Sequence, residues 1–272
     1  MINEIALLNE ASEVAKDLYG PRSGPRARFT RGLLDLCKQV QDKDVLVIHN
    51  PGGWGSSRLD RCLEWERSVV EGVKSTVEKM GYSPFITQYF RSGDSLWAHL
   101  RDSKDQVTAF FQGRYSQAKV LAAELKLLDR HLDDLKVVMV GVSQGAGFTN
   151  AVMRQLEEKN DIYSIELGTL FMHLRHRQLT DHTLAIDGNG ELPDPIVHRN
   201  LWLGARVYTT APLRWIRYRL MRKPRSFTRC IDLPGHDYNW DYPGVKKKIE
   251  GFLETIFSSK SRRHHHETGE IY

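Results

Sequence analysis

The sequence predicts an α/β protein with a mainly parallel central sheet, helices on both faces of the sheet and a helical extension at the N-terminus. Three observations support this fold class. Short apolar runs alternate with longer amphipathic stretches along the chain. The apolar runs are continuous, as is typical of strands that are buried on both faces. The chain has 272 residues, 40% of them apolar, which suffices for one large domain.

The first 43 residues are predicted to form the helical extension. Apolar side chains recur at helical spacing in residues 1–18 and again in residues 29–40. Between these stretches, residues 20–28 read GPRSGPRAR. Because glycine and proline interrupt regular structure, this segment predicts a break between two helices.

Residues 44–258 are predicted to form the main domain, in which strands alternate with helices. The predicted strands are residues 45–48, 84–90, 135–140, 162–167, 182–186 and 227–231. The predicted helices are residues 59–80, 95–132 (with a possible break near Gly113), 145–158 and 242–257. Parallel sheets bind ligands beyond the carboxyl ends of their strands, so functional residues are expected just after these strands.

The composition of the chain bears on its expected location in the cell. No apolar run reaches the length of about 18 residues expected of a membrane span, and the N-terminus lacks the pattern of a secretory signal. The three cysteines, Cys37, Cys62 and Cys230, are widely spaced, which argues against a disulfide framework and a zinc site and predicts a cytoplasmic location. Residues 259–272 are predicted to be a flexible tail that is basic and contains histidines.

The segment GVSQG, residues 141–145, matches the G-x-S-x-G pattern of a nucleophile elbow. A predicted strand precedes it and a predicted helix follows it, as the elbow requires. The helix N-terminus would direct its dipole toward the site. We therefore expect Ser143 to be a nucleophile. The alternative is a glycine-rich turn that binds phosphate at the helix N-terminus.

A serine nucleophile needs a base, which in such a site is a histidine on a loop after a later strand. His236 satisfies this condition, since it follows the last predicted strand and precedes the last helix. His182 and His198 do not follow strand ends. His49, at the end of the first predicted strand, is expected to orient the adjacent loop.

The acid that orients the histidine should lie between the serine and the histidine in the chain. The segment DGNGELPD, residues 187–194, follows the fifth predicted strand. Glu191 and Asp194 lie far enough into this loop to reach a neighbouring strand end, and both remain candidates. Asp187 fits a turn cap better, because aspartate before Gly-Asn-Gly is typical turn chemistry.

The oxyanion of an acyl-transfer reaction needs two backbone donors. One is expected from Gln144, directly after the serine. The other is expected from Gly52, Gly53 or Trp54, in the glycine-rich loop after the first predicted strand. Glycines there can expose N–H groups without obstruction by side chains. A simple turn is the alternative interpretation of this loop.

Over roughly residues 44–258, the chain resembles the α/β-hydrolase superfamily. The resemblance rests on four segments that occur in the family's order: HNPGGWG, GVSQGAG, DGNGELPD and LPGHDY. It implies a triad of Ser143, His236 and either Glu191 or Asp194, and a site that needs no metal or organic cofactor. The leading antiparallel strands of larger members are not evident, so the resemblance is to a minimal core.

Residues 213–229 form an unusually basic segment with seven Lys and Arg and no acidic residue. It is predicted to be partly helical, with Trp215, Ile216 and Leu220 on one side. Such a segment can contact anionic lipid or a phosphate-bearing substrate such as an acyl-CoA, or it can be a solvated cationic face. No nucleic-acid recognition motif is present, so no nucleic-acid partner is expected.

These features predict a serine hydrolase that cleaves a small-molecule carboxylic ester or thioester through an acyl-enzyme. Two alternatives remain open. The fold could serve as a non-catalytic module that binds an acidic ligand, or the triad could transfer the acyl group to an acceptor other than water.

Overall fold

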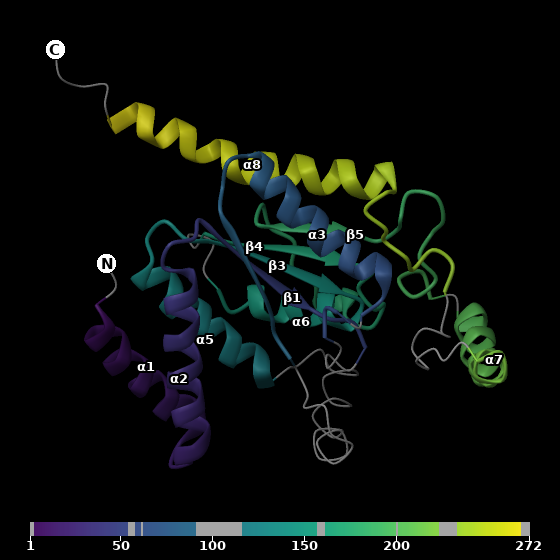
Figure 1. Ribbon diagram of the computed structural model, residues 1–272, viewed down its shortest axis with the longest axis horizontal. Helices are drawn as coiled ribbons and strands as arrows, with labels where there is room; N and C mark the ends of the chain where they lie inside the picture. Colours follow the sequence, from purple (N-terminus) through teal and green to yellow (C-terminus); the bar gives the residue numbers. More distant parts are fainter. Residues whose placement is uncertain are drawn as a thin grey trace.

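The computed structural model describes residues 3–53, 58–60, 62–90, 116–156, 161–199, 201–222 and 233–267. A five-stranded, all-parallel sheet lies at its centre with the strand order β2-β1-β3-β4-β5 (Figure 1). The strands are β1 (Val45–Asn50), β2 (Pro84–Gln88), β3 (Lys136–Val142), β4 (Ile162–Leu167) and β5 (Thr183–Ile186). The predicted α/β class is therefore confirmed. The predicted strand at residues 227–231 lies outside the described residues.

Helices cover both faces of the sheet (Figure 1). Successive side chains of a strand point to opposite faces, so each buried strand contributes to two cores. One face is covered by α1 (Glu4–Tyr19), α2 (Ser23–Val40), α5 (Ser116–His131) and α6 (Gln144–Met153), and the other by α3 (Glu64–Lys79) and α8 (Pro243–Glu267). In β1, Leu46 and Ile48 pack into the first core, and Val45 and Val47 pack into the second. The continuous apolar runs follow from this double burial.

The N-terminal helices belong to the main core. Leu7 and Ala11 of α1 and Phe29 and Leu33 of α2 are buried in the same apolar cluster as β1 and β3. The predicted break at residues 20–28 is too long, since α2 begins at Ser23. Pro25 lies in the first turn of this helix, where the missing N–H would have no intrahelical partner.

Several helix ends differ from the prediction. The helix α3 begins at Glu64, α6 ends at Met153, and α7 (Leu201–Leu220) begins well before the basic segment. The helix α8 continues to Glu267, into the range expected to be a flexible tail, because no glycine or proline interrupts it after Gly251. Within the described residues, no helix combines the length and apolar character needed to cross a bilayer.

The strand order places a topological switch between β1 and β3. From this central pair the chain builds outward to β2 on one side and to β4 and β5 on the other. In open α/β sheets of this order, ligands bind outside the carboxyl ends of the two strands at the switch. The loop after β1 and the serine after β3 both lie at this edge.

The loop that carries His236 is held against α3. Trp240 packs its indole onto Gly72, where a Cβ atom would overlap the ring. The Ser68 hydroxyl donates to Asn239 Oδ1 at 3.1 Å and accepts from the Trp240 N–H at 3.1 Å. This face of α3 therefore fixes the position of the loop.

We expect Gly72→Ala to lower the free energy of unfolding by about 1–3 kcal/mol, because the new methyl group must displace the Trp240 indole. Urea titration measures the change. Gly32→Ala is the matched control: Gly32 lies within α2, and a Cβ atom there would meet no other atom within 4 Å, so this substitution should stabilise by roughly 0.5–1 kcal/mol. Equal stability changes in the two variants would contradict the packing described.

Candidate active site

Ser143 has a strained backbone at the turn between β3 and α6. Its φ of 54° and ψ of −114° are unusual for a residue with a side chain. The Ser143 N–H donates to the Leu167 carbonyl of β4 at 2.8 Å, and the Ser143 carbonyl accepts from the Ala146 N–H at 3.1 Å. Although Ser143 occupies the N-cap position of α6, its hydroxyl makes no capping hydrogen bond. The backbone is thus held while the hydroxyl remains available.

The two glycines of the G-x-S-x-G segment are required by space. A Cβ atom on Gly141 would lie 2.5 Å from Thr149 Oγ1 and 2.7 Å from the Gly145 carbonyl oxygen. A Cβ atom on Gly145 would overlap the carbonyl oxygen of Asn50 at the end of β1. The N-terminus of α6 therefore lies directly against the carboxyl ends of β1 and β3, and only glycine permits this approach.

His236 is paired with Asp194. Its Nδ1 lies 2.7 Å from Asp194 Oδ2, and the Tyr238 hydroxyl donates to the same oxygen at 2.5 Å. The other oxygen, Oδ1, accepts from the Ile196 N–H at 2.8 Å. Asp194 is fully buried, so these donors replace water around its carboxylate.

The hydrogen bonds keep Asp194 ionised. Burial alone would raise its pKa, but the hydrogen bond and charge of His236, with the donors from Tyr238 and Ile196, outweigh burial and lower the pKa below its ordinary value. Burial and the neighbouring carboxylate raise the pKa of Tyr238, so its phenol stays protonated and donates. A charged Asp194 accepts a hydrogen bond from His236 Nδ1–H, which keeps the hydrogen on Nδ1 and leaves Nε2 as the basic nitrogen.

Ser143 and the His236–Asp194 pair both lie near the carboxyl end of β4. Gly168, directly after β4, lies against both members of the pair: a Cβ atom there would be 2.6 Å from Asp194 Oδ2 and 2.8 Å from His236 Cε1. Its neighbour Leu167 accepts the Ser143 N–H. Among the described residues, the Ser143 hydroxyl and His236 Nε2 make no hydrogen bond, either to each other or to a third residue.

The two other carboxylates of the loop after β5 lie away from His236. Glu191 is exposed, and its backbone N–H donates to Asn189 Oδ1 at 3.0 Å. Asp187 pairs with Arg177 Nη1 at 2.7 Å. Of the two candidates left open by the sequence, the structure places Asp194 on the histidine and Glu191 in solvent.

A second hydrogen-bond network holds the loop after β1. The Leu59 N–H donates to Gln88 Oε1 at 2.8 Å, which identifies the oxygen of the Gln88 amide. The Gln88 Nε2 then donates to His49 Nδ1 at 2.9 Å. His49 must therefore carry its hydrogen on Nε2, which donates to Glu66 Oε1 at 2.9 Å. His49 is fully buried and Glu66 nearly so.

The same Glu66 oxygen accepts the Gly52 N–H at 3.1 Å. This bond corrects one expectation: Gly52 directs its N–H to Glu66 and so anchors the loop, rather than donating to an oxyanion. Gly52 also lies against Ser143, with a Cβ position 3.7 Å from Ser143 Cβ. Gly53 follows with a φ of 55°, Gln144 is the first residue of α6, and Trp54 lies outside the described residues.

Sequence reasoning missed Glu66, Tyr238 and Gly168. A signal for Glu66 was present, because it falls on the apolar face of α3 together with Val69, Val70 and Val73. An acidic residue that is buried on such a face needs a partner, because Glu is almost never fully buried unless it is paired. No comparable signal marks Gly168, whose role depends on a contact with a distant loop.

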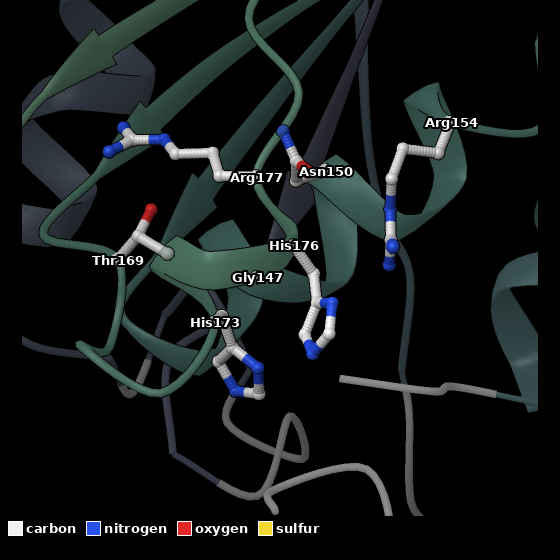
Figure 2. A pocket seen from close by; sticks show the side chains of 7 residues that line it. All are labelled: Gly147, Asn150, Arg154, Thr169, His173, His176 and Arg177. Atoms are coloured by element: carbon white, nitrogen blue, oxygen red, sulfur yellow. The ribbon is translucent and has the colours of Figure 1, made fainter. Parts of the chain in front are cut away.

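A small polar pocket lies beside α6, lined by Gly147, Asn150, Arg154, Thr169, His173, His176 and Arg177. Figure 2 shows the His173 and His176 rings on one side and the Arg177 and Asn150 side chains on the other. Its volume of about 10 Å³ has room for a single water molecule. Thr169 Oγ1 and Arg177 Nη2, both buried, have no hydrogen-bond partner among the described residues and could bond to it.

Glu166 is bonded to two of the residues that line this pocket. Arg177 Nε donates to its Oε2 at 3.2 Å, and Asn150 Nδ2 donates to its Oε1 at 2.9 Å. Burial raises the pKa of Glu166 to about 7, although the bonds from Asn150 and Arg177 oppose this rise. Within the described residues, no three His, Cys, Asp or Glu side chains are grouped to hold a metal ion.

No model of a known protein family matches the chain, and no curated protein does.

We expect Glu66→Ala to lower the free energy of unfolding by about 2–5 kcal/mol, because the buried N–H groups of His49 and Gly52 lose their shared acceptor. Glu66→Gln should recover most of this loss, since its amide oxygen can still accept. Chemical denaturation measures both variants. Glu71, on the same helix with a side chain 64% exposed, is the control, and Glu71→Ala should change stability by no more than roughly 0.5 kcal/mol.

The raised pKa of Glu166 predicts a pH dependence of stability. Between its ordinary pKa of 4.5 and the folded value of about 7, the folded protein holds a proton that the unfolded chain has released. The stability of the wild type relative to Glu166→Gln should therefore fall by about 3 kcal/mol as pH rises through this interval. Urea titrations from pH 4.5 to 8 test this. Glu254 is exposed, so the plot of stability against pH for Glu254→Gln should run parallel to that of the wild type. If the plot for Glu166→Gln also runs parallel to that of the wild type, the prediction is wrong.

Proposed function

We propose that the protein is a serine hydrolase of the α/β-hydrolase type that cleaves a carboxylic ester or thioester. The observation that carries the proposal is the position of Ser143. It combines a strained backbone, an unengaged hydroxyl and a helix N-terminus on one side with the pair of His236 and the buried Asp194 on the other. A structural turn needs neither the strain nor the buried acid.

In the proposed reaction, Ser143 Oγ attacks the carbonyl carbon of the substrate, and His236 Nε2 accepts the hydroxyl proton. The resulting imidazolium is stabilised by Asp194, whose carboxylate is 2.7 Å from Nδ1. Because Tyr238 and the Ile196 N–H hold this carboxylate in place, the ring keeps the tautomer that leaves Nε2 basic.

Negative charge develops on the carbonyl oxygen during this attack. The proposed donors are the backbone N–H of Gln144 at the start of α6 and that of Gly53 or Trp54 in the loop after β1. The N-terminal end of α6 adds the positive end of its dipole. Glu66 supports this part of the site indirectly, since it fixes the Gly52 peptide beside the nucleophile.

The tetrahedral intermediate then collapses and its bond to the leaving alcohol or thiol breaks. His236 gives its proton to the leaving group, and the acyl group remains on Ser143. Water attacks the acyl-enzyme with His236 as base, which releases a carboxylic acid and restores the serine.

A fluorophosphonate probe tests the proposal, because it labels only a serine activated in this way. We expect rapid labelling of the wild type at Ser143 and none in Ser143→Ala. Asp194→Asn should slow labelling by about 10³–10⁴-fold, since the amide favours the wrong histidine tautomer. The readout is the labelling rate by mass spectrometry of the modified peptide.

Glu191→Gln is the matched control, since Glu191 lies on the same loop but is exposed. It should label at the wild-type rate. An unlabelled wild type that nonetheless binds small carboxylates, with binding that Ser143→Ala or His236→Ala weakens, would favour a non-catalytic binding module. Labelling with product partitioning to added alcohol or amine would instead indicate acyl transfer.

A further inference from the structure

The helix α7 carries a row of exposed apolar side chains. Trp202 and Leu220 are each 80% exposed, Leu213 is 69% exposed and Ile216 is 47% exposed. With about 100° of rotation per residue, these four positions fall within roughly 60° of one another around the helix axis. They span roughly 27 Å along the helix, with the exposed Arg206 and Thr209 between Trp202 and the other three. We name these four residues the α7 stripe.

The stripe faces away from the protein. Val207 and Ala211 of the same helix are buried and lie on the opposite side of the helix, about 140–180° from Trp202. The helix thus already uses one apolar face for packing within the chain. In Figure 1, α7 stands apart from the sheet and its covering helices. A second apolar face on such a helix indicates an external contact.

The charge around the stripe is of one sign. Residues 201–222 contain five arginines, Arg206, Arg214, Arg217, Arg219 and Arg222, and no acidic residue. All five are exposed, and Arg206 and Arg217 lie within about 60° of Trp202 beside the stripe. Arg219 stacks on the Trp215 ring, with its guanidinium carbon 4.4 Å from the ring centroid.

We propose that α7 binds the protein to an anionic lipid surface. The helix would lie in the plane of the interface, with the α7 stripe inserted among the acyl chains and the arginines at the level of the phosphate groups. Helices that bind in this way combine a tryptophan and leucine face with a basic face. The long arginine side chains can reach the headgroups while their apolar stems stay beside the stripe.

Charge disfavours a second copy of the chain as the occupant. Two α7 helices packed through their stripes would bring ten arginines together with no acidic side chain from either helix. An anionic membrane supplies the opposite charge over the whole length of the helix. The proposal is independent of the proposed hydrolase activity, because it uses no residue of the triad.

Flotation with lipid vesicles tests the proposal. The full-length wild type should float with vesicles containing phosphatidylglycerol, should bind far less to pure phosphatidylcholine vesicles, and should be released as salt rises. Leu213→Glu with Ile216→Glu should weaken partitioning at least about tenfold. Arg206→Gln with Arg217→Gln should also weaken it on the order of tenfold or more. Ser143→Ala should float like the wild type.

The control places the same changes far from α7. Ile5, 74% exposed on α1, and Arg31, exposed on α2, supply a variant, Ile5→Glu with Arg31→Gln, that should float like the wild type. Circular dichroism checks that every variant is folded. Three outcomes would overturn the proposal: no flotation of the wild type, flotation that the glutamate pair leaves unchanged, or a stripe-dependent dimer in light scattering without vesicles.

Discussion

The site depends on the close approach of the α6 N-terminus to the ends of β1 and β3. The Gly145 position touches the Asn50 carbonyl, and the Gly141 position touches Thr149, so neither can carry a side chain. This contact leaves the chain one residue in which to turn from strand to helix, and that residue is Ser143. Its positive φ is the consequence. The surrounding hydrogen bonds, to Leu167 and from Ala146, offset a strain of about 1–3 kcal/mol.

The helix α3 aligns the two halves of the site. Near its N-terminus, Glu66 accepts from His49 and Gly52 and so holds the loop after β1 beside Ser143. Within the next two turns, Ser68 and Gly72 anchor the loop that carries His236. A shift of this helix would therefore move the loop after β1 and the loop that carries His236 together. Residues of α3, far from both Ser143 and His236 in the sequence, can therefore govern the geometry of the candidate site.

Sequence reasoning was strongest where the signal is local. The five described strands and the strand–serine–helix context of Ser143 follow from apolar runs and glycine positions, which are properties of neighbouring residues. The choice between Glu191 and Asp194 was not local. Both lie in one loop, and only the packing of Tyr238 and Gly168 around Asp194 decides which is buried beside His236. Contacts between segments so distant in the chain leave no periodic pattern.

The start of α7 was missed for a related reason. The basic segment was recognised by its charge, but the helix begins upstream of it, among residues with little charge. Because the helix has apolar side chains on two opposite sides, its sequence lacks the single apolar face by which an amphipathic helix is recognised. Val207 and Ala211 satisfy the inner face, so the α7 stripe is surplus to the needs of folding. An exposed row of large apolar side chains raises the risk of aggregation. The helix also carries five arginines and no acidic residue. An anionic membrane matches both features, because its headgroups are negatively charged and its acyl chains are apolar, whereas a soluble ligand does not combine the two.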